Sequence, residues 1–596
     1  MENPATPPEM KKPNDEEVVR VTDKGLSSLD SDSGHFEADL STLPPGYFTS
    51  SFFLGSMMAI GLGLMAGTAG FAYAAPILNL INADIGPDPN IVWTALTYTL
   101  TSAVTVTIIG RVTDIFGRRY VFIGGAALGV IGSVIGATAT SVNMLIGGTT
   151  IIGIAAATQL SHYYVMGELL PMKYRLAGNA FCYFLCIPGA GFAPVIANAF
   201  VKHHPSVGWR GGYYILIGIN AASLVCWVLF YHPPTFKMKH GAEASAWAYA
   251  KAFDYVGAVL YTGGALVFMM GLNWGGVVYP WSSAQVIGTV VVGAVALVAF
   301  AAWETFANLS EPLVPVQYFR NLKWVASVIL TGLGASVYFA FALVWPSMVA
   351  VLYSDPARPL YGPLLASFVA FFILLGQITG GALGKWIGHL KWQVVVMAIL
   401  GGICFACVAT CGPDDRMRAS VLVSFGVFFN GWMEGGAITI VTLTAPDQSN
   451  LGSAGGVAGS IRFLISAIAS SIYNVILSNR LASTIPALVP PAVVEAGLPL
   501  ESVPAFILGF TTGSFDGVSG LTADILAIGT RAYQEANANA YRTVFLSNIG
   551  FSAVAIICAL LVPNVDKYMT NQVATTLHQG KNEKIAGEKS SLEHDV

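Results

Sequence analysis

The sequence predicts an all-α polytopic membrane protein with about fourteen transmembrane helices, and three observations support this prediction. Hydrophobic residues fill 54% of the 596 positions and charged residues only 10%, a balance outside the range of soluble domains. Apolar stretches long enough to cross about 30 Å of hydrocarbon recur between Phe52 and Val562. The 64 glycines favour closely packed helices over a barrel, because small residues let helix backbones approach each other.

The apolar stretches give the number and order of the predicted helices. We place them near 52–78, 91–110, 120–139, 143–166, 176–200, 212–231, 254–273, 284–303, 324–352, 362–384, 392–411, 418–444, 454–478 and 542–562. Because this number of crossings is even, both termini are expected on the same side of the membrane.

The distribution of Lys and Arg predicts the orientation. Positive residues in short loops are retained on the cytoplasmic side, and alternate loops are enriched in them, including the loops that carry Arg111 and Lys173. Both termini are therefore expected in the cytoplasm.

The predicted domains are a disordered cytoplasmic tail (1–46), an N-terminal six-helix bundle (47–232), a cytoplasmic linker (233–253), two inserted helices (254–303), a C-terminal six-helix bundle (304–562) with a long extracellular loop (481–541), and a cytoplasmic tail (563–596). The long loop is expected to form short interfacial helices or a lid.

One loop has a pattern of glycines and charges that predicts a gate. It follows the second predicted helix and contains Gly110, Arg111, Asp114, Gly117, Arg118 and Arg119. The glycines let helix ends approach closely, and Asp114 can pair with a basic residue on a neighbouring helix end. Pairs of this kind can hold one side of a two-state bundle shut.

A degraded second copy of this loop follows the tenth predicted helix. Gly381 and Gly388 repeat the seven-residue glycine spacing of the first loop, and Lys385 takes the place of Asp114. Duplicated halves are common in membrane transporters. The offset of eight helices therefore predicts a six-helix half, two inserted helices and a second six-helix half.

The end of the fourth predicted helix carries candidate partners for the gate. Glu168, Pro171 and Arg175 follow each other closely there. A Glu168 side chain that faces Arg111 or Arg175 would complete a charge cluster, since charges within a membrane usually serve function. The alternative is that Glu168 snorkels to the interface and takes no part in a latch.

Glu434 is the strongest candidate for proton coupling. It lies twelve positions before Pro446, as Gln159 lies twelve positions before Pro171, so the two are expected to be equivalent positions of the repeat. Twelve residues at a rise of about 1.5 Å give roughly 18 Å of depth, near the middle of a membrane, where desolvation favours a protonated carboxyl. The alternative is a structural ion pair with Arg462.

Other polar side chains are expected at a similar depth. His162 and Tyr163 share a helical face with Gln159, and His162 is either a proton relay or a hydrogen-bonded packing residue. Arg462 is a candidate for holding an anionic substrate. The aromatic candidates for lining an amphipathic cavity are Tyr98, Tyr183, Tyr261 and Trp432.

Several classes of protein are not indicated. The seven cysteines lie in apolar runs, which argues against a disulfide framework or a zinc site, and no basic face suggests nucleic acid. No Walker loop, HExxH motif or nucleophile elbow is visible, so we expect neither an enzyme nor a cofactor. The expected partners are a small-molecule substrate, protons and the lipid bilayer, and the protein is expected to be a monomer. A nontransporting sensor of the same fold is the remaining alternative.

These motifs resemble the major facilitator superfamily, whose signature loop matches the residues from Gly110 to Arg119. Within that superfamily the chain is similar to the fungal fourteen-helix group that contains trichothecene efflux pumps and, more distantly, siderophore-iron transporters. The resemblance spans nearly the whole chain. It rests on five further stretches at 167–175, 208–211, 231–236, 274–281 and 311–319.

The resemblance implies proton-driven export of a trichothecene-like toxin or another amphipathic secondary metabolite, and so self-resistance. It implies the plasma membrane, with a vacuolar or vesicle membrane as the other location. The alternative is proton-coupled uptake of a ferric siderophore. The fifth helix departs from the glycine-rich pattern of drug antiporters, since it keeps Gly189 and Pro194 but has small residues or Asn at the other positions.

Overall fold

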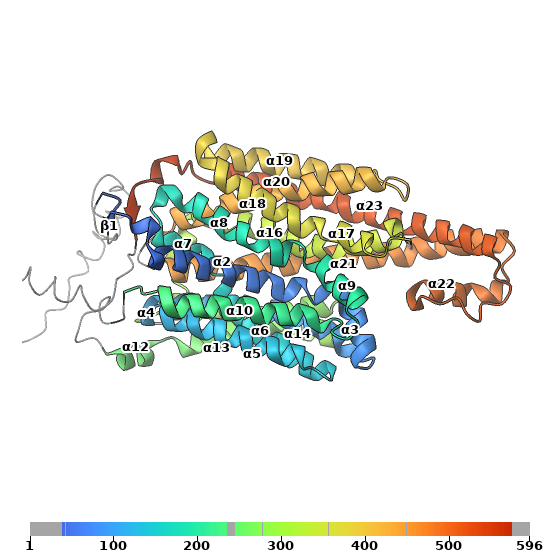
Figure 1. Cartoon of the computed structure of the whole chain (residues 1–596), viewed down its shortest axis with the longest axis horizontal. Coiled ribbons are helices and arrows are strands. Elements are labelled where there is room, and N and C mark those ends of the chain that lie inside the picture. Colours follow the sequence, from blue (N-terminus) through green and yellow to red (C-terminus); the bar gives the residue numbers. More distant parts are fainter. Residues whose placement is uncertain are drawn as a thin grey trace, which may run out of the picture.

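The protein folds as a bundle of long helices (Figure 1). The structure is a computed structural model, and it describes residues 38–574 apart from positions 42, 44, 235, 237–244, 277, 356, 447 and 449. Within this part of the chain, 14 helices are long and apolar enough to cross a membrane. The predicted fold class and the predicted number of helices are confirmed.

The first six membrane-length helices form the N-terminal half. They are α2 (Ser51–Ala72), α4 (Trp93–Phe116), α5 (Arg119–Ala137), α6 (Val142–Gln159) continued by α7 (His162–Leu169), α8 (Arg175–Cys186) continued by the π-helical turn η5 (Ile187–Gly191) and α9 (Ala193–His203), and α10 (Arg210–Phe230). Short elements between them are η1 (Tyr47–Thr49), η2 (Ala75–Ile77), α3 (Leu78–Ile85), η3 (Pro89–Val92) and η4 (Met172–Tyr174). Pro188 and Pro194 interrupt the fifth helix, because proline has no N–H to donate to the preceding turn.

The remaining helices form an inserted pair and the C-terminal half. The inserted pair is α13 (Tyr255–Trp274) and α14 (Ala284–Phe306). The C-terminal half contains α16 (Leu322–Met348) with η6 (Val349–Tyr353), α17 (Tyr361–Ala366) with α18 (Phe368–Ile387), α19 (Leu390–Val408), α20 (Arg416–Leu443), α21 (Leu451–Glu495) and α23 (Ala523–Leu561). Shorter elements are α12 (Ala246–Ala252), α15 (Gln317–Arg320), η7 (Leu500–Ser502), α22 (Val503–Thr512) and η8 (Asp566–Tyr568).

The two halves meet along long seams at the centre of the bundle. Figure 1 shows α18, α19 and α20 on one side and α5, α6 and α10 on the other. Helix α4 packs against α21 and helix α8 packs against α18, so each half contributes two helices to the seams. The inserted helix α13 contacts both α4 and α21. Only 17% of the apolar stretch of α14 is buried within the protein. This packing fits the predicted order of six, two and six helices.

Both ends of the described part of the chain lie at the same end of the bundle, which we call the tail end. Strand β1 (Ala38–Asp39) pairs with β2 (Gln572–Val573) there. The backbone N–H of Lys173 donates to the carbonyl of Thr570 at 3.1 Å. The prediction that both termini share the cytoplasmic side of the membrane stays a prediction, which the position of the described ends fits. The tail predicted as disordered to position 46 already contains β1; its residues 1–37, the tail residues 575–596 and linker residues 237–244 lie outside the described residues.

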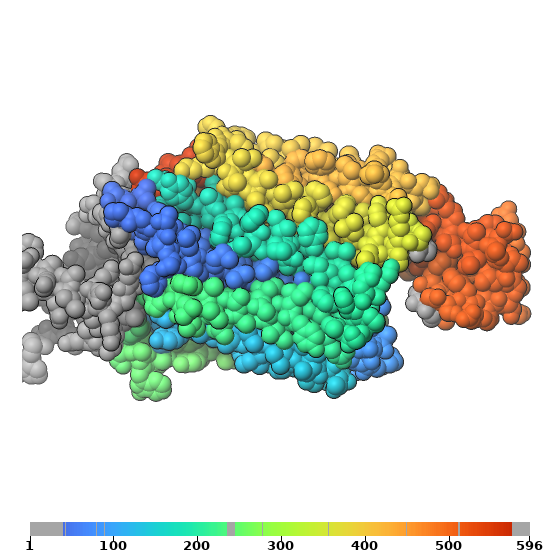
Figure 2. Space-filling view, viewed as in Figure 1, coloured from blue at the N-terminus to red at the C-terminus, as the bar shows by residue number. Residues whose placement is uncertain are grey.

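At the opposite end, which we call the hairpin end, the structure differs from the predicted loop 481–541. Helix α21 continues to Glu495 and α23 already begins at Ala523, so most of this segment extends the two helices. Figure 2 shows the extension standing clear of the bundle as a separate lobe. The sequence suggested a loop because α21 contains Pro486, Pro490 and Pro491. The lobe has its own buried apolar cluster, which offsets the hydrogen bonds lost at these prolines.

Candidate transport site and gate

A cavity lies between the two halves near the middle of the bundle. Its volume is about 60 Å³, which is room for about four waters at roughly 15 Å³ each. Its lining comes from α2, α4, α7, α8 and η5 of the N-terminal half and from α16, α18, α20 and α21 of the C-terminal half. Its lining includes these tyrosines and polar or charged side chains: Tyr98, His162, Tyr163, Tyr183, Tyr338, Gln377, Glu434 and Arg462.

Glu434 is the acidic residue of this cavity, and its side chain is held on both carboxyl oxygens. Oε1 accepts hydrogen bonds from Nε and Nη2 of Arg462 at 3.0 and 2.7 Å, and Oε2 accepts one from Nε2 of Gln377 at 3.2 Å. Charge-assisted bonds of this kind are the stronger class of hydrogen bond. The predicted pairing of Glu434 with Arg462 is present, and Gln377 is an additional partner.

Glu434 fits between two helices of the C-terminal half because glycine faces it. It lies on α20 and is fully buried, and α16 passes it at Gly334. A Cβ atom on Gly334 would approach the Glu434 side chain to 2.8 Å, closer than real Cβ contacts. Glycine at position 334 therefore lets α16 and α20 pack around the carboxylate.

The aromatic wall of the cavity surrounds a histidine. His162 is 4% exposed, and neither ring nitrogen has a hydrogen-bond partner among the described residues. Its ring makes edge contacts with Tyr163 and Tyr183, with centroids 5.5 and 5.3 Å apart. The hydroxyl of Tyr163 donates to the carbonyl of Gly455 in the other half. The cavity thus offers an unpartnered polar ring among aromatic faces.

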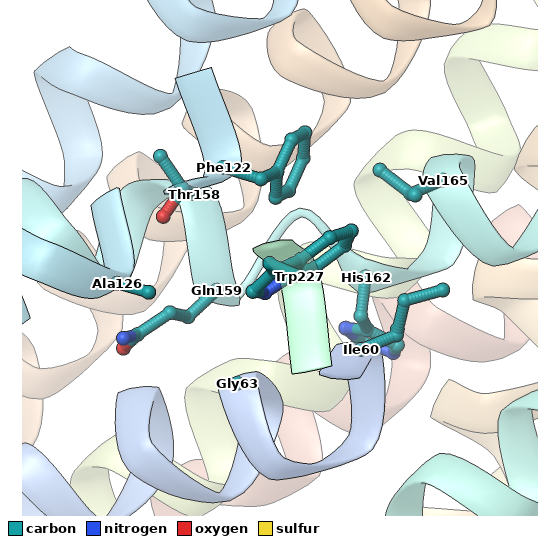
Figure 3. Close-up of a pocket in the computed structure, with 9 residues that line it drawn as sticks. All are labelled: Ile60, Gly63, Phe122, Ala126, Thr158, Gln159, His162, Val165 and Trp227. Carbon is teal, nitrogen blue, oxygen red and sulfur yellow. The ribbon is translucent and has the colours of Figure 1, made fainter. Parts of the chain in front are cut away.

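Gln159 does not line the central cavity, in contrast to the expected equivalence with Glu434. Its Nε2 donates to Oδ1 of Asn220 on α10 at 2.6 Å, within the N-terminal half. Figure 3 shows Gln159 beside a second, smaller pocket that Trp227 and His162 also line. The equal depth of the two residues stays a prediction, but their side chains point in different directions, because direction depends on the rotation of each helix. His162 is the residue that lines both spaces.

The predicted aromatic candidates divide into two groups. Tyr98 and Tyr183 line the cavity. Tyr261 lies instead on the inserted helix α13, where its hydroxyl contacts Ser460 and accepts from Thr107 at 3.1 Å. Trp432 donates from Nε1 to Gln393 at 3.2 Å within the C-terminal half.

At the tail end, Asp114 binds the start of a helix from the opposite half. Its Oδ1 accepts from the backbone N–H of Gly452 at 3.1 Å, and its Oδ2 accepts from that of Ser453 at 2.5 Å. Both amides belong to the first turn of α21, where unpaired N–H groups and the helix dipole favour an anion. The partners of Asp114 across the seam are thus backbone amides, and the basic residue that we expected on a neighbouring helix end lies at the start of α5. The basic partner of Asp114 is Arg118 of its own loop, at 3.1 Å.

Glu168 contacts Arg118, not Arg111 or Arg175 as expected. Arg118 therefore lies between two carboxylates, and it also stacks over the Tyr164 ring at 5.1 Å. Burial disfavours the charge on Arg118, but the carboxylates of Glu168 and Asp114 outweigh burial and raise the pKa of the guanidinium above its ordinary value. Glu168 thus pairs with Arg118, and Arg118 pairs with Asp114.

The other basic residues of this region act at separate places. Arg175 crosses the seam, donating to the carbonyl of Thr442 and to Oε1 of Gln448, both at 3.0 Å. It reaches the other half because the chain turns at Pro171 and restarts as α8 at Arg175. Two further contacts involve arginines of the first loop: Arg111 pairs with Glu311, and Arg119 donates to the carbonyl of Val228 at 3.0 Å.

Glycines bring the halves together at the gate. A Cβ on Gly110 would lie 2.3 Å from the carbonyl oxygen of Gly452 and 2.9 Å from Cα of Gly456, so α4 and α21 touch backbone to backbone. Gly117 has a φ of +89°, which other residues rarely adopt. Position 117 therefore requires glycine for the turn and position 110 for the contact.

The degraded copy of the loop makes a different contact. A Cβ on Gly381 would lie 2.6 Å from the carbonyl oxygen of Leu176, so this glycine also lies at the seam, and Gly388 has a φ of +68°. Lys385 cannot cap a helix start as Asp114 does. Its ammonium instead lies 4.6 Å from the centre of the Tyr174 ring in the N-terminal half, a cation–π contact.

Comparison with known proteins identifies the family. Residues 25–595 match the model of the family described as fungal trichothecene efflux pump (TRI12). The chain belongs to this family. It is 27% identical to trichothecene efflux pump TRI12 of Trichoderma arundinaceum, over 91% of this chain and 92% of that protein. It is 28% identical to the MFS-type transporter prx5 of Penicillium rubens, over 89% of this chain and 94% of that protein.

A solved structure supports the same fold. The human organic anion transporter MFSD10 (TETRAN) superposes with a TM-score of 0.50 at 13% identity, covering 86% of this chain and all of that chain. The major facilitator fold is therefore confirmed, and so are the predicted family and the prediction of a transporter in place of an enzyme. These matches do not test the roles of individual residues.

Sequence reasoning missed several residues of this transporter's site. Gln377 and Tyr338 line the cavity, and Glu311 pairs with the gate loop. Gln377 had a usable signal, because it is a polar residue one turn before Gly381 in an otherwise apolar helix. The other two had none, since a tyrosine in an apolar run and a glutamate in a loop are common features of membrane proteins.

We expect Asp114→Asn to weaken closure at the tail end. An uncharged amide loses the attraction to the first turn of α21, which we put at about 2 kcal/mol from charge-assisted bonds and the helix dipole. Such a loss shifts the balance between closed and open states roughly thirtyfold. The measurement is the distance between spin labels at the exposed positions Tyr120 and Trp386, in a background without the native cysteines. Asp84→Asn is the matched control, because Asp84 pairs with Arg210 inside one half; equal distances in both variants would contradict the latch.

Proposed function

We propose that this member of the efflux family uses the proton gradient to export a fungal toxin, trichothecene-like or another amphipathic secondary metabolite, across the plasma membrane. One of the relatives named above supports efflux of such metabolites, because it is named a trichothecene efflux pump. The observation that carries the proposal is Glu434, a buried carboxylate held by Arg462 inside a cavity between the halves. The cytoplasmic position of both tails and a monomeric state are part of the same proposal.

Proton coupling follows from the contacts of Glu434. In its ionised form it neutralises Arg462. A proton on Glu434 removes that attraction and frees the guanidinium, which is 17% exposed toward the cavity. A substrate hydroxyl can donate to the ionised carboxylate of Glu434, and a proton on Glu434 takes that acceptor away. Substrate and proton then compete for Glu434, and this competition is what an antiporter needs. The alternative, a purely structural pair, predicts no change in proton coupling when Glu434 is neutralised.

The lining favours an amphipathic and uncharged substrate. Tyr98, Tyr183, Tyr338 and the apolar side chains around them present ring faces, and His162 presents unpartnered nitrogens. Arg462 is already neutralised by Glu434, so the cavity has no net charge to attract an anion. An oxygenated terpenoid skeleton, which combines apolar rings with a few hydrogen-bonding groups, suits this environment.

Transport requires a conformational change from the present state. The halves touch at the tail end through Asp114 and Arg175, as described above. At the hairpin end the N–H of Val195 contacts Oγ of Ser367 at 3.3 Å, and the rings of Phe192 and Phe371 lie 5.2 Å apart. A cavity with room for about four waters cannot admit a metabolite until one of these ends opens. The structure is therefore best described as an occluded state.

The siderophore alternative draws no support from the family model or from the relatives reported above.

Purified protein in proteoliposomes tests the proposal directly. With an imposed proton gradient, a trichothecene is expected to move against the proton flow, and a ferric siderophore is expected not to move. Movement of the siderophore with the protons, and none of the trichothecene, would overturn the proposal. Expression in a toxin-sensitive fungus should raise resistance, with a fluorescent tag at the cell surface.

A further inference from the structure

Two buried carboxyl groups lie at the tail end of the inserted helices, away from the central cavity. Asp254 precedes α13 and is 4% exposed, and Glu304 is in the last turn of α14 and is 8% exposed. Neither takes part in the transport site or in the gate. Carboxyl groups are rarely buried this deeply without a partner.

One oxygen of each group has clear donors. Oδ1 of Asp254 accepts from the backbone N–H of Gly257 at 2.8 Å and from Nε1 of Trp303 at 3.0 Å. Oε1 of Glu304 accepts from the backbone N–H of Val314 at 3.0 Å. These bonds place both groups where α13, α14 and the segment after α14 meet. They account for only half of the acceptor atoms.

The backbone N–H of Leu313 also lies near the Glu304 carboxyl, but the second oxygen of each group has no hydrogen bond of good geometry. Oδ2 of Asp254 and Oε2 of Glu304 are both buried and have no hydrogen-bond partner among the described residues. The two carboxyl groups are nevertheless neighbours, because Trp303, which donates to Asp254, immediately precedes Glu304, and Asp254 acts directly on the Glu304 carboxyl. Two ionised carboxylates at such a distance repel each other in a medium of low dielectric constant, whereas one shared proton gives both oxygens a partner. Pairs of this kind titrate as a unit.

No cation among the described residues neutralises the pair. The neighbouring charges are Glu311, whose backbone bridges to Phe253, Arg111, which pairs with Glu311, and Lys251, which lies over the Trp247 ring at 5.6 Å. Each of these is engaged elsewhere. A proton is therefore the counter-charge that the site lacks.

We propose that Asp254 and Glu304 bind one proton between them and form a second proton site, separate from Glu434. The proton comes from water at the tail end and returns there, so no other reactant is required. The proposal does not depend on the transported substrate. It assigns a binding role to the inserted helices, which the transport cycle as described above does not use.

The position of the pair links it to the gate. Glu304 holds Val314, and four residues later the hydroxyl of Tyr318 contacts Oγ of Ser453 at 2.6 Å. Ser453 is also a backbone donor to Asp114. Loss of the shared proton places two like charges on α13 and α14 and strains the segment between Glu304 and Tyr318. Proton binding at this site therefore favours the closed gate.

Infrared spectroscopy of the purified full-length protein tests the site. The wild type is expected to show the carbonyl stretch of a protonated carboxyl that disappears as the pH is raised. The same titrating band is expected to be absent from Glu304→Gln and from Asp254→Asn, because an amide replaces the shared proton in each. It is expected to remain in Glu434→Gln, so failure of this proposal and failure of the transport mechanism are distinguishable.

The outcomes that overturn the proposal are equally specific. If both amide variants keep every titrating carboxyl band of the wild type, the proton belongs to another residue and the proposal fails. Failure of both variants to fold would also contradict the shared proton, since glutamine and asparagine reproduce the protonated partner in shape and in hydrogen bonding. Glu535→Gln, on an exposed part of α23, is the matched control and should leave the band unchanged.

Discussion

Glu434→Gln is expected to abolish proton-driven transport while exchange of substrate across the membrane continues. Glutamine keeps the shape and one acceptor for Arg462, but it can neither release nor take up a proton. The cycle then runs without proton movement and does no work against a gradient. Two measurements in proteoliposomes check this result. With a pH gradient, net accumulation of a trichothecene should fall to the level of liposomes without protein. At equal pH, exchange of labelled for unlabelled trichothecene should continue.

The control for this result is Glu535→Gln, which removes the same charge from an exposed position on α23. Loss of the charged acceptor at position 434 is expected to cost about 2 kcal/mol of stability, so surface expression and thermal unfolding must be compared in both variants. A folded Glu434→Gln protein that still accumulates substrate against the gradient would show that the pair with Arg462 is structural. The proton would then enter the cycle elsewhere.

The sequence predicts the helices of this protein well because burial in lipid leaves a strong signal. An apolar run such as 284–303 has one physical solution in a bilayer, a helix whose backbone groups are satisfied internally, and α14 forms there. The repeat could also be found, because Gly110 and Gly381 both lie at the seam and must keep their small size. The lengths of the membrane helices and the glycines at their contacts can therefore be predicted from the sequence alone.

Directions of side chains are harder to predict. In a soluble helix the apolar stripe marks the buried face, but in a membrane both lipid and protein core accept apolar residues. Gln159 and Glu434 were expected to be equivalent positions at equal depth, and yet Gln159 points to Asn220 while Glu434 points to the cavity. The rotation of each helix is set by packing between helices that are distant in the sequence.

Charge partners were missed for a related reason. Asp114 pairs with an arginine at the start of a neighbouring helix, as expected, but its partners in the other half are backbone amides at the start of α21, which no sequence motif displays. Glu168 could reach several arginines within the loop regions, and only the turn at Pro171 decides that Arg175 points to the other half. Side-chain chemistry narrows the choices, and the chain path selects among them.

Gly110→Leu is expected to hold the tail end open and to stop transport. Even a Cβ atom at this position would lie 2.3 Å from the carbonyl oxygen of Gly452, and a leucine adds three further carbon atoms in the same space. Overpacking of this kind costs about 1–3 kcal/mol or more, and separation of the two halves relieves it without unfolding either one. The measurement is the distance between labels at Tyr120 and Trp386, which should lengthen, together with transport in proteoliposomes, which should be lost.

The matched control is Gly124→Leu on the neighbouring helix α5, where a Cβ would meet no atom within 4 Å. This control adds the same side chain to the same half of the protein, so it should leave both the label distance and transport unchanged. Both glycine variants should unfold at similar temperatures, because the Gly110 clash lies between the halves and not within one. Normal transport by Gly110→Leu would show that α4 and α21 need not touch at this point during the cycle, and the contact with Asp114 would then have to close the gate alone.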